Sequence, residues 1–144
     1  MEIVKIEQRA GCRAPSDRIW TLLSDLSAWD RWNPYETEAS GTIAFGSPIT
    51  LMERLPGLPE QQVQAVVRDW QPLTQLVWTQ KRGWLFNTVR YFEIEELETE
   101  SCIIATGTIF SGLRAELFHD KHKKAIKAAY GEIIEGLRLA AEAD

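Results

Sequence analysis

The sequence has little of several features that would point directly to a function. It has two cysteines in 144 residues, Cys12 and Cys102, which are too few for a disulfide framework and are not spaced as a metal-binding pair. It has no apolar run of membrane-spanning length, and its first residues lack the long apolar middle of a signal peptide. We therefore expect a cytoplasmic protein with free thiols and no membrane span.

Basic residues are also scarce, because 16 Lys and Arg stand against 21 Asp and Glu, which gives a net charge of -5. No Lys-rich or Arg-rich run occurs before residue 113, so the chain lacks the basic surface with which proteins contact a phosphate backbone. We expect no nucleic-acid partner.

Motifs for covalent or cofactor chemistry are absent as well. The sequence holds no Gly-x-Ser-x-Gly, no reactive-cysteine signature and no glycine-rich phosphate loop. Its two histidines, His119 and His122, lie three residues apart, but no third metal ligand follows at a suitable spacing, so we expect both on the solvent surface. We expect no metal and no cofactor. Whether the chain is an enzyme stays open, and a non-catalytic role is favoured.

The clearest feature that the sequence does have is a long helical segment at its end. Residues Leu113–Glu142 are rich in Ala, Leu, Lys and Glu, and apolar residues recur there at helical spacing. A helix of this length runs about 40 Å, so it must lie across the whole width of its partner. Near its front is a basic patch, for which a solvated helix face, an acidic partner and lipid headgroups are all open. The patch is Lys121, Lys123, Lys124 and Lys127.

The segments before this helix predict one antiparallel sheet in an α+β domain spanning residues 1–144. Residues 2–13 alternate as a half-buried strand does, and two short helices should follow, one beginning at Pro15 and one over Leu26–Trp32. Short turns separate six further strands, with no connection long enough for a crossover helix. These strands are expected at 38–43, 48–55, 61–71, 75–81, 85–97 and 102–111.

The order and spacing of several motifs resemble a known family. The motifs are Ala14-Pro15 with Ile19-Trp20, Asp25, Trp29-x-x-Trp32-Asn33-Pro34, Gly41, Gly46, Trp70-x-Pro72-x-x-x-Leu76-x-Trp78, Phe92-x-Ile94 and Phe110-Ser111-Gly112. Over nearly the whole chain they resemble the START-like (SRPBCC) superfamily, and within it the bacterial polyketide cyclase/dehydrase-like proteins. The resemblance implies a helix-grip fold, in which a curved sheet of about seven strands grips the last helix. It also implies that the first strand lies beside the last, with Cys12 near Cys102. It carries over no shared catalytic residues.

A curved sheet around one helix leaves space at one end, which side chains either fill or line. We expect a hydrophobic cavity there, lined by aromatic residues and a few polar groups. The alternative is that the rings simply form the core. Trp29, Trp32 and Trp84 lie near turns or helix ends, where a pocket mouth forms. The expected ligand-binding residues are Trp29, Trp32, Glu53, Trp78, Trp84, Phe86, Arg90 and Phe110.

Strand alternation turns two charged residues inward, because Arg90 shares a face with Phe92, and Glu53 shares a face with Leu51. The alternative is a β-bulge that turns Arg90 outward. An inward Arg90 needs a carboxylate, a carbonyl or an anionic ligand head. Our hypothesis is that it binds the head of an amphipathic acid. Arg90→Met should then leave folding intact or improved.

Three functions are open. The first is binding or carriage of a small hydrophobic or amphipathic molecule, such as a lipid. The second is a polyketide cyclase/aromatase-like enzyme, in which Arg90, Tyr91 or Glu53 assists proton transfer. The third is a co-chaperone-like module for a partner protein, which would need an exposed apolar patch. The sequence does not determine the oligomeric state.

Overall fold

The computed structural model describes residues 3–82 and 86–143, with side chains described outside residues 81–86. The elements follow the expected order. They are β1 (Ile3–Cys12), α1 (Ser16–Ser24), the 3-10 helix η1 (Leu26–Arg31), β2 (Glu36–Gly41), β3 (Pro48–Glu53), β4 (Gln61–Gln71), β5 (Gln75–Arg82), β6 (Phe86–Glu98), β7 (Ser101–Ser111) and α2 (Ala115–Glu142). The predicted α+β class is confirmed.

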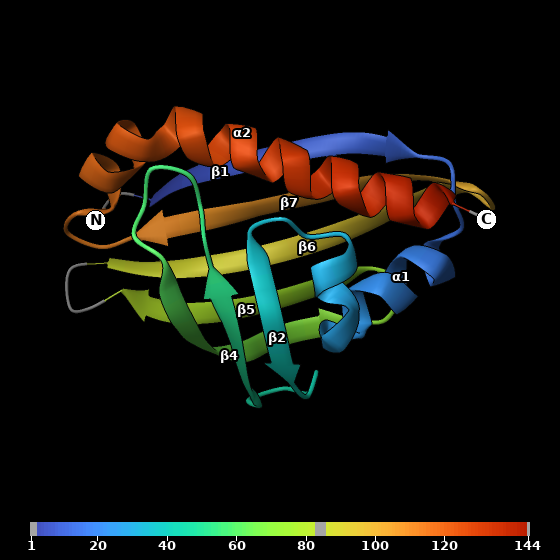
Figure 1. Cartoon of the computed structure of the whole chain (residues 1–144), viewed down its shortest axis with the longest axis horizontal. Coiled ribbons are helices and arrows are strands. Elements are labelled where there is room, and N and C mark those ends of the chain that lie inside the picture. The colour runs from blue at the N-terminus through green and yellow to red at the C-terminus, as the bar shows by residue number, and fades with distance from the viewer. Residues whose placement is uncertain (1–2, 83–85, 144) are drawn as a thin grey trace.

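The seven strands form one sheet in the order β1-β7-β6-β5-β4-β3-β2, and every neighbouring pair is antiparallel. The first strand pairs with the last, as the resemblance implied. Figure 1 shows α2 lying lengthwise across the sheet, with α1 and η1 closing the end at which α2 finishes. Among the described residues, no helix combines the length and the apolarity that a membrane crossing requires.

Several boundaries differ by one or two residues from those expected, and two of them lie near η1. Pro15 is the residue before α1, with an extended backbone (φ -71°, ψ 152°), so the helix begins one residue later than predicted. Strand β2 begins at Glu36, two residues earlier than predicted. The side-chain oxygen of Asn33 accepts the backbone N–H groups of Tyr35 at 3.1 Å and Glu36 at 2.9 Å. This local turn directs the chain straight from η1 into the strand.

The core centres on four aromatic rings from η1, the residue after it, and two central strands. Trp29, Trp32, Trp78 and Phe92 form this aromatic cluster, with neighbouring ring centroids 5.4 to 6.1 Å apart. Trp29 is fully buried, and its Nε1 donates to the carbonyl of Leu23 at 2.9 Å, which satisfies its polar atom. The inward face of α2 covers the cluster with aliphatic side chains, among them Ile133, Ile134 and Leu137.

The two cysteines face each other across the edge of the sheet. Cys12 and Cys102 are direct partners in the β1–β7 register, and both are buried. The expected proximity is therefore confirmed, and the free thiols stay a prediction. Burial, with smaller contributions from Glu142 and Cys102, raises the pKa of Cys12 to about 11.

Candidate functional site

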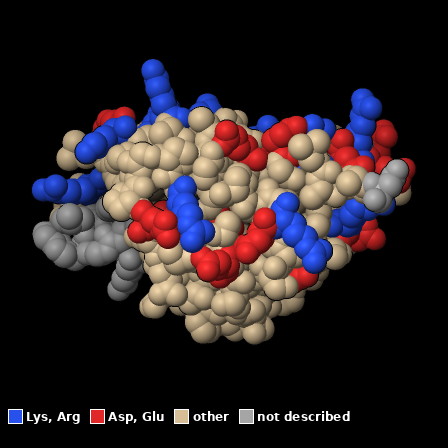
Figure 2. Space-filling model, viewed as in Figure 1, with Lys and Arg blue, Asp and Glu red and all other residues tan. Residues whose placement is uncertain are grey.

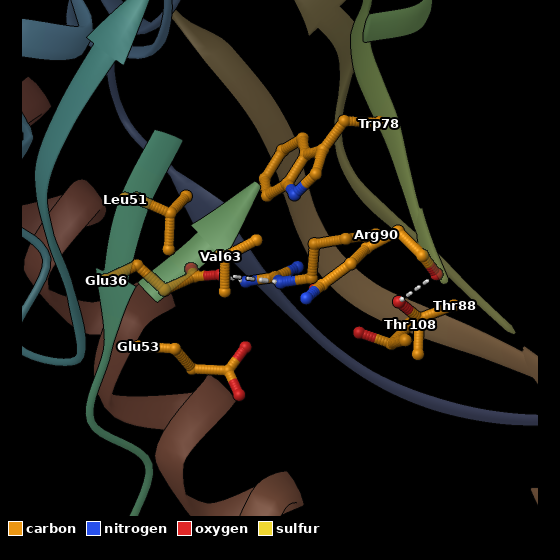
Figure 3. A pocket seen from close by; sticks show the side chains of 9 residues that line it. Glu36, Leu51, Glu53, Val63, Trp78, Thr88, Arg90 and Thr108 are labelled. Carbon is orange, nitrogen blue, oxygen red and sulfur yellow. Dashed lines mark hydrogen bonds and ion pairs between the residues drawn. The ribbon is translucent and has the colours of Figure 1, made fainter. Parts of the chain in front are cut away.

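A small cavity lies between the sheet and α2, and six of the seven strands contribute side chains to it. Its volume is about 10 Å³, which is room for about one water molecule. Its lining is Glu36, Leu51, Glu53, Val63, Trp78, Gln80, Thr88, Arg90 and Thr108 (Figure 3). The large apolar cavity that the sequence led us to expect is not found at this place. The described residues instead enclose a narrow and mostly polar space.

Arg90 points inward, as alternation predicted, because its register with both neighbouring strands is regular: it stands between Trp78 of β5 and Thr108 of β7. Its Nε and Nη2 donate to the two carboxylate oxygens of Glu36 at 3.0 and 2.8 Å. Its Nη1 donates to the carbonyls of Tyr91 and Gly107 at 2.9 Å each and to the hydroxyl of Thr106. The carboxylate and the carbonyls that an inward Arg90 needs thus come from the protein itself.

Aromatic rings enclose the charged end of Arg90. The guanidinium carbon lies 4.3 Å from the ring centre of Tyr130, 4.9 Å from that of Phe92 and 5.5 Å from that of Trp78. Burial alone would lower the pKa of Arg90, but Glu36, Tyr130 and Glu53 together outweigh it, and the pKa is raised. The guanidinium of Arg90 therefore keeps its charge although it is buried.

A second carboxylate lies beside this pair. Glu53 stands directly opposite Glu36 in the β2–β3 register, is buried, and accepts a hydrogen bond from Gln61 at 3.2 Å. Figure 3 shows the carboxylates of Glu36 and Glu53 directed toward the same space as Arg90. One guanidinium thus lies within the field of two carboxylates.

Hydroxyl groups complete the polar lining. Thr108 shares a hydrogen bond with the hydroxyl of Tyr130 from α2, and Thr88 donates to the carbonyl of Gln80 at 3.3 Å. Burial raises the pKa of Tyr130, so its hydroxyl keeps its proton at neutral pH. The cavity therefore offers hydroxyl and carboxylate groups over apolar walls formed by Leu51, Val63 and Trp78.

Comparison with solved structures identifies the architecture. The di-domain ARO/CYC StfQ from the steffimycin biosynthetic pathway superposes with a TM-score of 0.76 at 11% identity, over 97% of this chain and 51% of StfQ. This chain therefore spans about half the length of StfQ. Norcoclaurine synthase from Thalictrum flavum gives a TM-score of 0.71 at 13% identity, over 99% of this chain and 96% of the synthase.

A hypothetical protein from Helicobacter pylori gives a TM-score of 0.76 at 14% identity, over 98% of this chain and 88% of that protein. The chain has a START-like helix-grip fold. No protein-family model matches the sequence, and a search of curated proteins finds no relative. At such low sequence identity, the similarity to these structures shows a shared fold.

Within the helix-grip interior, three of the expected ligand-binding residues lie together. Glu53, Trp78 and Arg90 all line the cavity. Phe110 is buried and packs against Phe118, with ring centres 5.6 Å apart. Trp84 and the side chain of Phe86 lie outside the described residues.

Trp29 and Trp32 lie in the aromatic cluster rather than at a pocket mouth, because η1 folds back under α2 and buries both rings. Trp32 has one distinctive property. Its Nε1 is the single buried side-chain polar atom, among the described residues, without a hydrogen-bond partner. An unsatisfied buried donor costs about 1 to 3 kcal/mol. An oxygen acceptor brought to this atom would remove that cost.

Sequence reasoning missed Glu36, Gln80, Thr88 and Thr108 as lining residues. Alternation gave a usable signal for Thr88 and Thr108, since each lies two residues before an inward residue, Arg90 or Phe110. No comparable signal existed for Glu36. It was placed in a loop, and its strand is separated from β6 by three others in the sheet.

The expectation for His119 needs correction. His119 is buried, and its Nδ1 lies 3.1 Å from the carboxylate of Asp120, whereas His122 is half-buried against the ring of Phe118 at 4.6 Å. The inward face of α2 includes Ala115, His119 and Ile126, and this places His119 toward the sheet. Within residues 3–82 and 86–143, no group of His, Cys, Asp and Glu side chains is arranged to hold a metal.

Proposed function

We propose that this chain binds a small, uncharged amphipathic molecule at the polar end of its helix-grip interior. One observation carries the proposal: polar side chains from β2, β3, β5, β6 and β7 converge on a single buried cavity within an otherwise apolar core. Binding sites combine apolar walls with a few convergent polar groups, as this cavity does.

Stability alone does not account for this polar cluster. A buried ion pair is often no more stabilising than well-packed apolar residues of similar volume, because desolvation opposes the attraction between the charges. The pair of Arg90 with Glu36 nonetheless lies in the buried interior, with side chains 7% and 4% exposed. Buried charged groups that gather in this way are candidates for a functional site.

The contacts of Arg90 favour an uncharged guest over the amphipathic acid of our first hypothesis. Glu36 already accepts two parallel hydrogen bonds from the Nε and Nη2 edge of the guanidinium. An anionic head placed here would face the carboxylates of Glu36 and Glu53 at low dielectric, which opposes its ionised form. A hydroxyl on an apolar ring has no such penalty and can bond with Thr88, Thr108 or Glu53.

The cavity must enlarge to admit such a guest, because about 10 Å³ holds roughly one water molecule. Gln80 is the half-buried member of the lining, so its side chain can change rotamer with less loss of packing than the buried side chains around it. Side-chain rearrangement of this kind is common when ligands bind.

The test compares two probes with the same ring, 2-naphthol and 2-naphthoate, titrated at neutral pH by calorimetry and by tryptophan fluorescence. We expect 2-naphthol to bind at about micromolar level, and 2-naphthoate to bind roughly tenfold more weakly or less, because it adds a third carboxylate to the site. Failure of both probes, or tighter binding of the anion, would contradict the proposal.

Matched threonine variants locate the binding. Thr88→Val removes a hydroxyl that lines the cavity and keeps the side-chain shape. Thr79→Val is the control, because Thr79 lies between the inward residues Trp78 and Gln80 and faces the other side of the sheet. We expect only Thr88→Val to weaken 2-naphthol binding, by about fivefold for one neutral hydrogen bond. If both variants lost affinity for 2-naphthol equally, the binding site could not be assigned to this cavity.

A cyclase-like enzyme is the second candidate, favoured by two titratable side chains, Glu53 and Tyr130, that flank the Arg90 pair. A carboxylate base and a protonated phenol can together move a proton on a carbonyl compound. The measurement is deuterium exchange at the methyl group of 2-acetonaphthone, followed by NMR. Exchange that is faster with the protein than with its Glu53→Gln variant would support this activity.

A further inference from the structure

The first half of α2 carries most of the lysines of the protein. The chain has six lysines, and four of them lie between Lys121 and Lys127. All four are exposed. Residues 114–127 hold five basic and two acidic residues, a charge of +3, whereas the chain as a whole has -5, so the remaining residues carry -8. Positive charge is thus concentrated on one short segment of an acidic protein.

Large apolar side chains are exposed at the same corner. Leu113 is 79% exposed and Leu117 is 68% exposed, just before and just inside the start of α2. Ile3 is 71% exposed and pairs with Ser111, two residues before Leu113. We call this set, with the four lysines, the basic apolar corner. Figure 1 places the first turns of α2 beside the start of the described chain, and Figure 2 shows Lys and Arg side chains projecting at that end.

Helical spacing places one leucine and two lysines of this corner on a single exposed stripe of α2. Leu117, Lys121, Lys124 and Ala128 are separated by four, three and four residues, and all are exposed. The opposite side of the helix, with Ala115, Ile126 and Ala129, is buried against the sheet. Two acidic side chains, Glu116 and Asp120, also lie in this segment and leave its charge positive.

We infer that the basic apolar corner docks on an anionic lipid bilayer. Leucine side chains at the tip enter the boundary between headgroups and acyl chains, while lysines beside them bind the lipid phosphates. An acidic protein would satisfy the lysines but would give no role to three apolar side chains that project singly. The bilayer therefore fits both observations. The inference uses no residue of the cavity, so it stands independently of the proposed guest.

The test is co-sedimentation with vesicles. We expect the protein to bind vesicles that contain one third phosphatidylserine, not to bind vesicles of phosphatidylcholine alone, and to be released at high salt. The double variant Lys121→Gln, Lys124→Gln should weaken binding roughly thirtyfold, from about fivefold for each lysine. The charge-matched control is Arg31→Gln with Arg68→Gln, two exposed positions elsewhere, which should leave binding unchanged.

A second pair of variants tests the apolar contribution. Leu117→Gln should weaken vesicle binding by about tenfold. Leu139→Gln should not, because Leu139 is an exposed leucine of the same helix (56%) that lies between the acidic residues Glu135 and Glu142. Thermal unfolding of each variant establishes that it is folded.

Three results of the vesicle experiments would overturn the inference. They are absence of binding to the anionic vesicles, equal binding by the lysine variant and its control, and equal effects of Leu117→Gln and Leu139→Gln. Tighter binding to poly-glutamate than to the vesicles, unaffected by Leu117→Gln, would assign the corner to an acidic protein and would also overturn it.

Discussion

At the scale of single residues, the pair of Arg90 and Glu36 determines the character of the interior. Replacing Arg90 by methionine leaves the Glu36 carboxylate buried, with its side chain 4% exposed, and without its cation. We predict that Arg90→Met lowers the free energy of unfolding by about 3 to 5 kcal/mol. Urea unfolding measures it. This loss of stability is the opposite of our first hypothesis, in which Arg90 binds an anionic ligand and Arg90→Met leaves folding intact or improved.

The double variant Arg90→Met, Glu36→Leu separates the pair from the packing around it. Removing both charges leaves neither member of the pair without its partner, so the double variant should be clearly more stable than Arg90→Met. A double variant as unstable as Arg90→Met would show that the loss comes from the contacts of Arg90 with rings and carbonyls instead.

The thiol of Cys12 gives a pH-dependent prediction. Because burial raises its pKa from 9.0 to about 11 in the folded protein, folding favours the protonated thiol. This contribution is complete below pH 9 and is lost as the pH rises from 9 to 11. We expect iodoacetamide to label Cys12 much more slowly in native protein at pH 8 than in urea, as measured by mass spectrometry. Equal labelling rates in the two conditions would contradict the burial of this thiol.

At the scale of secondary structure, two glycines within α2, Gly136 and Gly131, should respond in opposite ways to replacement by alanine. A Cβ at Gly136 would lie 2.0 Å from the carbonyl oxygen of Trp32, so the helix approaches the end of η1 at this residue. We predict that Gly136→Ala destabilises the protein, by about 2 kcal/mol or more, although alanine is the better helix former. Chemical denaturation measures the change.

Gly131→Ala is the matched control on the same helix. A Cβ there would lie 3.5 Å from the nearest atom of Gln8, an ordinary contact. The substitution should therefore stabilise the protein by roughly 0.5 to 1 kcal/mol through helix propensity. Destabilisation by both substitutions would contradict this prediction, because it would mean that α2 has no room for an added methyl group at either position.

At the scale of the whole molecule, one core joins the elements. The aromatic cluster combines η1 with β5 and β6, and α2 covers it from the other side. We predict that far-UV circular dichroism and tryptophan fluorescence report the same midpoint in urea, because the sheet and α2 lose this core together. Two separate midpoints would divide the chain into units that unfold independently.

The sequence by itself determined the order of elements, the antiparallel sheet and the long last helix, and its alternation favoured an inward Arg90 and Glu53 while a β-bulge stayed open as the alternative. These features follow from periodicity and turn residues, which act between neighbours in the chain. For the same reason the inward direction of Thr88 and Thr108 could have been predicted, since each lies two residues before an inward residue of the same strand.

Only the tertiary structure decided what Arg90 contacts and how much space the interior holds. Glu36 lies at the edge of the sheet, four strands from β6 in the strand order, and meets Arg90 only because the sheet curves around its helix. The packing of η1 under α2 likewise brings the rings of Trp29 and Trp32 into the core rather than to a pocket mouth. Curvature and packing are properties of all seven strands together, so no local pattern in the sequence specifies them.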